Sequence, residues 1–427
     1  MAATVAARDG QTALALRITK NLAPPPPCAT FDHSGAATGD GGNVAFSPVS
    51  VHAALALVTA GACGATLAQL LTFLGAPSAE GLADFCRRVA DRVLAGRSCA
   101  GGPRVLFGGG IWVDASRGEL TDAFRNVAAK SYKADARTVS FTKEPEEAVK
   151  MINEWVKKAT RSLINNVITM SDVDAATDLV LANAVYFKGE WMDPFQPMYT
   201  STGTFNLLSG QQAEGKFMSN FARLKVACMD RFKVLELPYK SFRSYGDNAK
   251  GEVNASDWPD ASEATRYSMF IFLPDARDGI ATTVDMVTAS PAFMYSILAE
   301  MKEDYVDLKL PKFKITFNWT ELKDTLCQMG LTLPFSPEAA NLQGMCTGDE
   351  GDGVPLQPLF LTKVAHMAVV NVHEKGTEAA AVTVCLRGGG CPEHIVEFTA
   401  DHPFTFFIME KRSGVIVFAG HVLDPTK

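Results

Sequence analysis

The sequence predicts a mixed, β-rich α+β fold in one large domain. Apolar residues recur at helical spacing in several stretches, beginning with Leu14, Ile18 and Leu22, which are four positions apart. Other stretches, near 306–317 and 415–422, alternate apolar and polar residues as strands do. The chain has 427 residues, 47% of them hydrophobic, which is enough to bury a large core.

The expected elements are spread along the whole chain. The first helix ends before the run Pro24–Pro27, because proline breaks a helix interior. In order, we expect a helix through 14–22, a buried helix at 51–60, a helix at 66–74 followed by Gly75, a helix with the stripe Val149, Ile152, Val156 and Ala159, a strand at 177–187, and alternating strands near 306–317 and 415–422. The expected organisation is a flexible N-terminus at 1–10 and a single domain at 11–427, with polar loop insertions near 24–42 and 241–266.

Composition excludes several classes of partner. The net charge is -7 and the pI is about 5.6, so no basic surface for nucleic acid or an acidic membrane is expected. The sequence contains no run of eighteen apolar residues, the length that a helix spanning a bilayer would need. The first ten residues, M-A-A-T-V-A-A-R-D-G, lack a basic region before a long apolar core, so they do not read as a secretory leader. Nine cysteines without paired spacing indicate reduced thiols, and we expect a cytoplasmic (nucleocytoplasmic) rather than an extracellular protein.

The most informative segment runs from Glu374 to Thr383 and reads E-K-G-T-E-A-A-A-V-T. Its residues alternate with a period of two, so that one face of an extended strand is small and uncharged, as a strand entering a packed sheet requires. Taken alone, the segment is equally compatible with an Ala-rich helical turn, since Glu and Ala are good helix formers. The small face comprises Thr377, Ala379, Ala381 and Thr383, and the other face Glu378, Ala380 and Val382.

Several motifs, in a compatible order, resemble those of the serpins, inhibitors that trap a protease by inserting their cleaved reactive loop into a sheet. The serpin hinge is a glutamate, one residue, Gly-Thr, one residue and a run of alanines, which residues 374–381 match. The other matches are N-V-A-F-S-P-V-S at 43–50, N-A-V-Y-F-K-G-E-W at 183–191, A-D-H-P-F at 400–404 and S-G-V-I-V-F-A-G-H-V at 413–422. The resemblance runs from about residue 11 to 425 and is strongest to plant serpins. It implies a serpin fold: large mixed β-sheets, about eight or nine helices, and an exposed reactive loop near 374–399.

The resemblance also implies roles for individual residues. Ser47, Ser50, Asn183 and His366 match the family's shutter cluster, which helps to hold the main sheet closed. Buried polar groups must be hydrogen-bonded, so such a cluster has only a few discrete arrangements, as a switch requires. Two further matches lie at the entry of the loop. Trp191 falls where serpins place a tryptophan at the mouth of the sheet, and Lys312 matches the partner of the hinge glutamate Glu374. With Glu374, the residues that match the hinge are Gly376, Thr377, Glu378, Ala379, Ala380, Ala381 and Thr383.

Catalytic interpretations find no support in the sequence. It has no G-x-S-x-G motif, and the residue four after His373 is Thr377 rather than a second zinc ligand. The spacing of Cys385, Cys391 and His394 fits no metal site. Gly108-Gly109-Gly110 lacks the following Lys-Ser/Thr of a phosphate loop and instead indicates close packing of a turn or strand. We therefore expect no enzymatic activity, no cofactor and no metal.

Two peptide bonds qualify as the reactive bond. Serpins usually place seventeen residues from the hinge glutamate to the cut, which gives the bond Gly390–Cys391. Plant serpins frequently offer Leu-Arg, and Arg387 provides the cation that trypsin-like and Arg-specific cysteine proteases need. A cut at Arg387–Gly388 leaves an arm of fourteen residues, from Glu374 to Arg387, three short of the usual count. We favour Arg387.

The function predicted from these matches is inhibition of a trypsin-like serine protease or an Arg-specific cysteine protease by a suicide-substrate mechanism. The partner would be the target protease, held as a covalent acyl complex by a monomeric inhibitor. The alternative is a non-inhibitory serpin, a cleavable substrate, storage or binding protein, which the short arm and the triple glycine at 388–390 favour.

Overall fold

The computed structural model describes residues 2–25, 42–94, 103–241, 265–347, 358–377 and 394–427. These residues contain nine α-helices: α1 (Ala2–Asn21), α2 (Pro48–Thr59), α3 (Gly64–Phe73), α4 (Ala79–Arg88), α5 (Asp122–Val127), α6 (Pro145–Ala159), α7 (Ile280–Val287), α8 (Pro291–Glu300) and α9 (Leu322–Gln328). None of these helices is both long and apolar enough to cross a membrane.

The strands form two sheets, which together with the helices confirm the α+β class. The nine-stranded sheet has the order β1 (Val44–Phe46), β15 (Val415–Val422), β14 (Phe404–Glu410), β8 (Tyr267–Pro274), β7 (Phe232–Pro238), β6 (Gln212–Cys228), β9 (Lys302–Pro311) and β13 (Val396–Thr399), with β5 (Ser201–Asn206) beside β6. The six-stranded sheet has the order β10 (Phe313–Trp319), β11 (Lys363–Val372), β4 (Leu179–Glu190), β2 (Arg104–Asp114) and β3 (Asp135–Val139), with β12 (Gly376–Thr377) beside β4.

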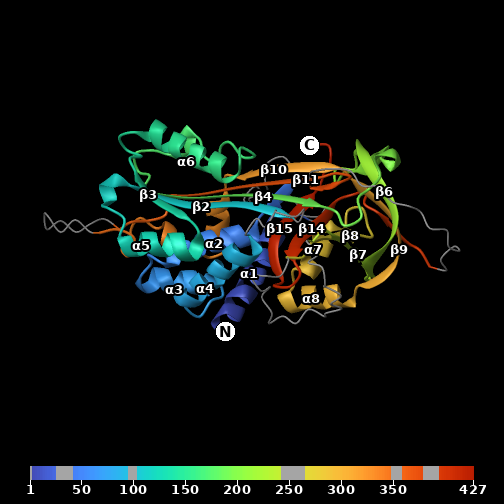
Figure 1. Ribbon diagram of the computed structural model, residues 1–427, viewed down its shortest axis with the longest axis horizontal. Coiled ribbons are helices and arrows are strands. Elements are labelled where there is room, and N and C mark those ends of the chain that lie inside the picture. The colour runs from blue at the N-terminus through green and yellow to red at the C-terminus, as the bar shows by residue number, and fades with distance from the viewer. Residues whose placement is uncertain (1, 26–41, 95–102, 242–264, 348–357, 378–393) are drawn as a thin grey trace.

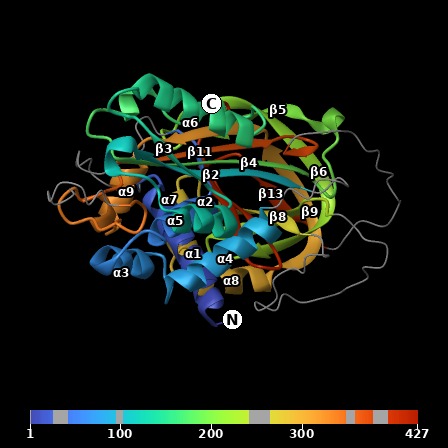
Figure 2. The same ribbon diagram turned by 60° about the vertical axis from the view of Figure 1, so that its left-hand side comes forward.

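The six-stranded sheet is covered on both faces (Figure 1). Helix α6 lies over one face, and α1 to α5 group on the other side, next to β14 and β15. The view turned by 60° shows the same layering, with α6 above the strands and α2 beneath them (Figure 2). A sheet enclosed in this way is buried on both sides, which explains why its central strands β4 and β11 are mostly apolar.

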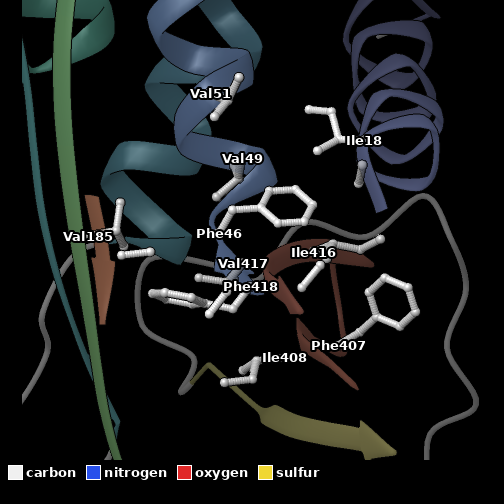
Figure 3. Close-up of a cluster of buried hydrophobic side chains, with 14 of the residues drawn as sticks. Ile18, Phe46, Val49, Val51, Val185, Phe407, Ile408, Ile416, Val417 and Phe418 are labelled. Carbon is white, nitrogen blue, oxygen red and sulfur yellow. The ribbon is translucent and has the colours of Figure 1, made fainter. Parts of the chain in front are cut away.

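Strand β4 divides the hydrophobic core into two parts. Its odd-numbered residues, such as Val185 and Phe187, belong to the main core, and its even-numbered residues, such as Val180 and Tyr186, pack in a second core that includes α6. Figure 3 shows part of the main core, where side chains from α1, α2, β4, β14 and β15 meet. Asn183 is odd-numbered, so its side chain is on the face that α2 covers.

Most of the helices predicted from periodicity are confirmed. The helix predicted at 51–60 is part of α2, which ends at Thr59 and has all its residues buried, and the helix predicted at 66–74 corresponds to α3. Gly75 follows α3 with a φ of +65°, the left-handed conformation that favours glycine after a helix. The stripe at 149–159 lies on α6, with Val149, Ile152 and Val156 buried.

The flexible N-terminus predicted for residues 1–10 is wrong, because α1 begins at Ala2. Its alanines favour a helix, and tertiary contacts hold its first turns. Gly10 approaches α3 so closely that a Cβ atom there would lie 2.0 Å from the carbonyl oxygen of Leu74. The Thr4 hydroxyl donates to Asp84 Oδ2 in α4 at 3.0 Å. The insertions predicted near 24–42 and 241–266 lie mainly outside the described residues.

The alternating run predicted near 306–317 is two strands in different sheets. It breaks at Lys312, so that β9 belongs to the nine-stranded sheet and β10 to the six-stranded sheet. The period of two continues on both sides of the break, and for that reason the pattern alone does not reveal it. The Lys312 N–H bonds to the carbonyl oxygen of Lys216 at 2.8 Å, which fixes the residue where the two sheets meet.

Gly108 allows α6 to lie close to the sheet, which is the close packing that the sequence predicts for the glycines at 108–110. They are in the middle of β2, opposite Ala184, Asn183 and Ala182 of β4. A Cβ atom on Gly108 would lie 2.8 Å from the Cβ of Ala159 in α6. The backbone of β2 therefore approaches α6 more closely than a side chain would permit.

Candidate functional site

The end of β11 is folded back into a hairpin. The N–H groups of His373 and Gly376 each donate to the carbonyl oxygen of the other at 3.0 Å, so Glu374 and Lys375 form a two-residue turn. After the turn, Gly376 and Thr377 pair antiparallel with Glu190 and Gly189 of β4. Strand β12 therefore lies between β11 and β4 and forms the beginning of an additional strand of the sheet.

Beyond the two residues of β4 that pair with β12, no described strand separates β4 from β11 and the sheet is closed. Strands β11 and β4 pair directly and in parallel, from Lys363 opposite Val180 to Val369 opposite Tyr186. An added strand that continued β12 would replace this pairing, since β12 already separates the two strands at one end. We use the name slot for the strand position between β4 and β11.

Gly376 is a position where glycine is required. Its φ of +134° lies in a region that L-residues rarely adopt. A Cβ atom would also lie 2.2 Å from the carbonyl oxygen of Gly189 and 2.6 Å from the Cα of Glu190. The hinge glycine identified from the sequence thus lets the chain turn into the slot against the backbone of β4.

The structure brings Glu374 and Lys312 together at the mouth of the slot. Their charged groups are 3.0 Å apart, and the Thr200 hydroxyl donates to Glu374 Oε1 at 2.9 Å. Partial burial raises the pKa of the Glu374 carboxyl, but hydrogen bonds from its own N–H, Lys312 and Thr200 outweigh this effect and hold the pKa below its ordinary value. The turn is therefore held by an ionised carboxylate.

Trp191 supports the same turn from the side of β4. Its indole Nε1–H donates to the carbonyl oxygen of His373 at 3.0 Å, and its backbone N–H to that of Lys375, also at 3.0 Å. The buried ring stacks on Tyr239 with ring centroids 4.4 Å apart. The N–H of Phe195 adds a bond to the carbonyl oxygen of Glu374 at 2.8 Å.

The sequence does not predict Thr200, Phe195 or Tyr239 as part of this site. Thr200 and Phe195 lie in an irregular segment after β4 and match no motif, and Tyr239 lies just after β7. Their contacts depend on how the segment folds against the turn, which local periodicity does not encode. The motif matches mark only Trp191, Lys312 and Glu374 in this region.

The four shutter residues meet in the middle of the slot, all fully buried. His366 on β11 is directly opposite Asn183 on β4, and the ring Nδ1 bonds to Asn183 Oδ1. The N–H of Ser47, the residue that caps α2, donates to His366 Nε2 at 3.1 Å. The Ser50 hydroxyl donates to Asn183 Oδ1 at 3.3 Å. The cluster links β11, β4 and α2.

These contacts define the protonation state of His366. Nε2 faces an N–H donor and must accept, so the ring proton is on Nδ1 and is donated to Asn183. Burial lowers the pKa of His366 to about 3, which keeps the ring neutral at physiological pH. A second proton would set Nε2–H against the Ser47 N–H and break the cluster. In the described part of the chain, Asn183 Nδ2 has no acceptor, so the closed arrangement leaves one buried donor unsatisfied.

The remaining predicted site residues lie outside the described residues. These are Glu378, Ala379, Ala380, Ala381 and Thr383 of the hinge, and Arg387, Gly388, Gly390 and Cys391 at the two candidate bonds. The described residues continue from His394, and β13 pairs in parallel with β9. The two ends of this segment are thus anchored in different sheets.

Comparisons with known proteins agree with this geometry. A family model described as Serpin (serine protease inhibitor) matches residues 30–425. Serpin-Z2A of Oryza sativa subsp. japonica is 40% identical over 432 residues, covering 98% of this chain and 97% of the relative. Serpin-Z2B of Triticum aestivum is 39% identical over 386 residues and covers 90% of each protein.

Solved structures match over nearly the full length. The native stressed conformation of Arabidopsis AtSerpin1 has a TM-score of 0.80 at 30% sequence identity, covering 99% of each chain. Human thyroxine-binding globulin matches with a TM-score of 0.77 at 21% identity, a likeness that shows the fold alone.

Proposed function

The chain belongs to the serpin family, and we propose that it inhibits trypsin-like serine proteases or Arg-specific cysteine proteases as a suicide substrate. The inhibited protease would cleave the reactive loop, whose N-terminal arm would then enter the slot between β4 and β11. Inhibition would require no cofactor. A monomeric, cytoplasmic (nucleocytoplasmic) protein remains part of the proposal.

The observation that carries the proposal is the slot that β12 begins. Strands β4 and β11 are parallel to each other, so one antiparallel strand between them can form a ladder with both. Each backbone hydrogen bond gained contributes about 0.5–1.5 kcal/mol net. An added strand therefore supplies a driving force that the closed sheet has not used.

The proposed chemistry is an interrupted peptide hydrolysis. The nucleophilic oxygen or sulfur of the protease attacks the carbonyl carbon of Arg387, and the bond to the nitrogen of Gly388 breaks. That nitrogen leaves with a proton as the new N-terminus, and Arg387 remains bound to the protease as an ester or thioester. If the arm enters the slot before water cleaves the ester, the protease is carried away with it and stays trapped.

The reactive bond proposed is Arg387–Gly388, with Gly390–Cys391 as the alternative. An acidic specificity pocket needs a cation, and Arg387 is the only basic residue between Thr377 and Cys391. The fourteen-residue arm moves the protease less far than seventeen residues would, by about 10 Å at ~3.3 Å per residue. We therefore expect a mixture of trapped complex and released, cleaved inhibitor.

Incubation with trypsin followed by denaturing gel electrophoresis tests the proposal. A covalent complex at the summed mass of the two proteins is expected beside a cleaved form. Mass spectrometry of the released C-terminal fragment identifies the bond, with a fragment that begins at Gly388 expected. A fragment that begins at Cys391 would refute the assignment to Arg387.

A non-inhibitory serpin is the second candidate, favoured by the short arm. The family fold does not by itself imply inhibition, since thyroxine-binding globulin, named for a binding role, shares the fold. Cleavage without a covalent complex, and with equal melting temperatures before and after the cut, would support this class. A sharp rise in melting temperature after cleavage is the result expected for an inhibitor.

A further inference from the structure

A hollow of about 490 Å³ lies between helix α6 and strand β3, which is at one end of the six-stranded sheet. Figure 1 shows α6 above this end of the sheet, and the turned view in Figure 2 agrees. Sites for small molecules typically have volumes of about 300–1,000 Å³, so the hollow is large enough to hold one. It is separated from the slot by β2 and β4, and the proposed function makes no use of it.

Strand β2 leaves this space open because it has a glycine where a side chain would point toward α6. Gly110 is opposite Asp135 and Trp112 is opposite Arg137, so these four positions are on one face of the sheet. Trp112 packs in the second core, which includes α6, and therefore Asp135 and Arg137 are on the side of α6. The Trp112 ring lies over the glycine, where a Cβ atom on Gly110 would be 2.4 Å from it.

Trp155 of α6 forms an aromatic wall of the hollow. Its ring packs edge to face on the buried Trp112, with ring centroids 4.8 Å apart. It also lies against the backbone of β2, where a Cβ atom on Gly108 would be 3.2 Å from the ring. Met151 and Ala159, one turn before and one turn after, extend the wall, and all three side chains are partly exposed. Such a wall suits a flat aromatic ligand, because rings stack on tryptophan and thioethers contact ring edges.

Two side chains of opposite charge stand beside this wall. Glu154 and Lys158 are exposed and, being four positions apart, are neighbours on the surface of α6. Within the part of the chain that the structure describes, neither forms an ion pair or a side-chain hydrogen bond. On the opposite wall, Arg137 bonds to Asp135 at 3.1 Å, so these two charges already compensate each other. The hollow therefore offers one unpaired anion and one unpaired cation next to an aromatic surface, with no net formal charge.

We propose that the hollow between α6 and β3 binds a small aromatic zwitterion, the class to which the free aromatic amino acids belong. The ring of the ligand stacks on Trp155, its carboxylate pairs with Lys158 and its ammonium group pairs with Glu154. An aromatic ligand with a single charge meets a like charge at one of these two side chains, and an aliphatic ligand loses the stacking. Because the ligand contacts α6 and β3 together, its binding also holds the helix on the sheet. The inference goes beyond the proposed function and does not depend on it.

Isothermal titration calorimetry with the full chain tests the ligand class. L-phenylalanine carries both charges, phenylpropionate lacks the ammonium group and phenylethylamine lacks the carboxylate. L-phenylalanine should bind saturably, and each analogue should bind roughly two- to five-fold more weakly, the effect of one exposed ion pair. No saturable binding of L-phenylalanine would overturn the site. An analogue that binds as tightly as L-phenylalanine would overturn the assignment to a zwitterion.

Substitutions locate the binding on α6. K158M should weaken L-phenylalanine and phenylpropionate by roughly the same two- to five-fold and leave phenylethylamine unchanged. E154Q should weaken L-phenylalanine and phenylethylamine and leave phenylpropionate unchanged. K157M, at an exposed position of α6 outside the hollow, is the matched control and should change nothing. Equal effects of K157M and K158M would place the ligand elsewhere and overturn the proposal.

Replacement of the aromatic wall gives a second test. W155L should lower the affinity for all three compounds by a similar factor, because each of them carries the ring. Unchanged affinities in a W155L protein that still melts cooperatively would refute the stacking on Trp155. If W155L does not fold, the two charge variants decide the matter alone, since they alter exposed side chains and are expected to keep the fold.

Discussion

The mouth of the slot and its centre are held closed in different ways. At the mouth, the turn at Glu374 and Lys375 is fixed by separate contacts from Lys312, Thr200 and Trp191, some of them partly exposed. At the centre, the shutter residues share atoms, since Asn183 Oδ1 accepts from both His366 and Ser50. Contacts at the mouth can therefore break one at a time, whereas the loss of one shutter partner leaves other buried groups unpaired.

This difference indicates a division of roles in opening the sheet. The mouth can tolerate small changes and tune how readily the strand starts to enter. The centre has two discrete states, closed or rearranged, and controls whether entry can continue. Substitutions at the two places should therefore differ in the size of their effects and in their dependence on pH and salt.

The largest effect is expected from a charge in the path of the entering strand. Position 377 is opposite Gly189, whose Cβ position faces the buried Tyr239. In T377R, the guanidinium would have to be buried in the opened sheet, at a cost of several kcal/mol, about 2–7 for an unpaired polar group and more for a charge. Inhibition should be lost while the fold is kept, and the variant should be an ordinary substrate of trypsin.

T377A is the control for this substitution, because it keeps a small side chain at the same position. Inhibition by T377A should be close to that of the unaltered protein. If T377R trapped trypsin with unchanged stoichiometry, the insertion mechanism would be refuted, and with it the comparison between mouth and centre.

The next largest effect is expected from the shutter. N183A removes the acceptor of His366 Nδ1–H and leaves this buried donor without a partner, whereas the Ser50 hydroxyl can still donate to the carbonyl oxygen of Ser47 at 3.1 Å. At about 1–3 kcal/mol for one orphaned buried donor, the free energy of unfolding should fall by about 1–3 kcal/mol. Chemical denaturation measures this loss. N318A, at an exposed position of β10, should stay within about 0.5 kcal/mol of the unaltered protein.

The two regions should also differ in pH dependence. His366 has a pKa of about 3 in the folded protein, lowered by burial from 6.5, so between these values the unfolded chain binds a proton that the folded one does not. Stability is full above pH 6.5 and falls as pH decreases through this window. His52 and His421, whose pKa values burial lowers to about 4, act in the same direction. No loss of unfolding free energy between pH 7 and pH 5 would contradict this assignment.

The contribution of Glu374 to stability changes over a lower pH range than that of the histidines. Because its folded pKa lies below the ordinary 4.5, its contribution is present above pH 4.5 and is lost as pH falls through the folded pKa. E374Q removes only this contribution. The difference in unfolding free energy between the unaltered protein and E374Q should be constant from pH 7 to pH 5 and should shrink below pH 4.5. A difference that already shrinks between pH 7 and pH 5 would show that the mouth titrates with the histidines.

Much of this site can be predicted from the sequence, and the exceptions have a common cause. Periodicity predicts α2, α3 and α6, and the motif matches mark Glu374, Trp191 and His366. Neither source gives the pairing of β12, because register depends on a hairpin whose turn contains no characteristic Asn-Gly or Asp-Gly pair.

The smallest effect is expected from Lys312. More than a third of its side chain is exposed, at 37%, so water and salt screen its attraction to Glu374. In K312M the loss of unfolding free energy should be at most about 1 kcal/mol at low salt and should decrease as salt is added. K314M, at an exposed position two residues away on β10, is the control and should show no such dependence on salt. A loss of several kcal/mol that salt does not reduce would mean that the pair anchors the mouth as firmly as the shutter holds the centre, and the proposed division between them would have to be abandoned.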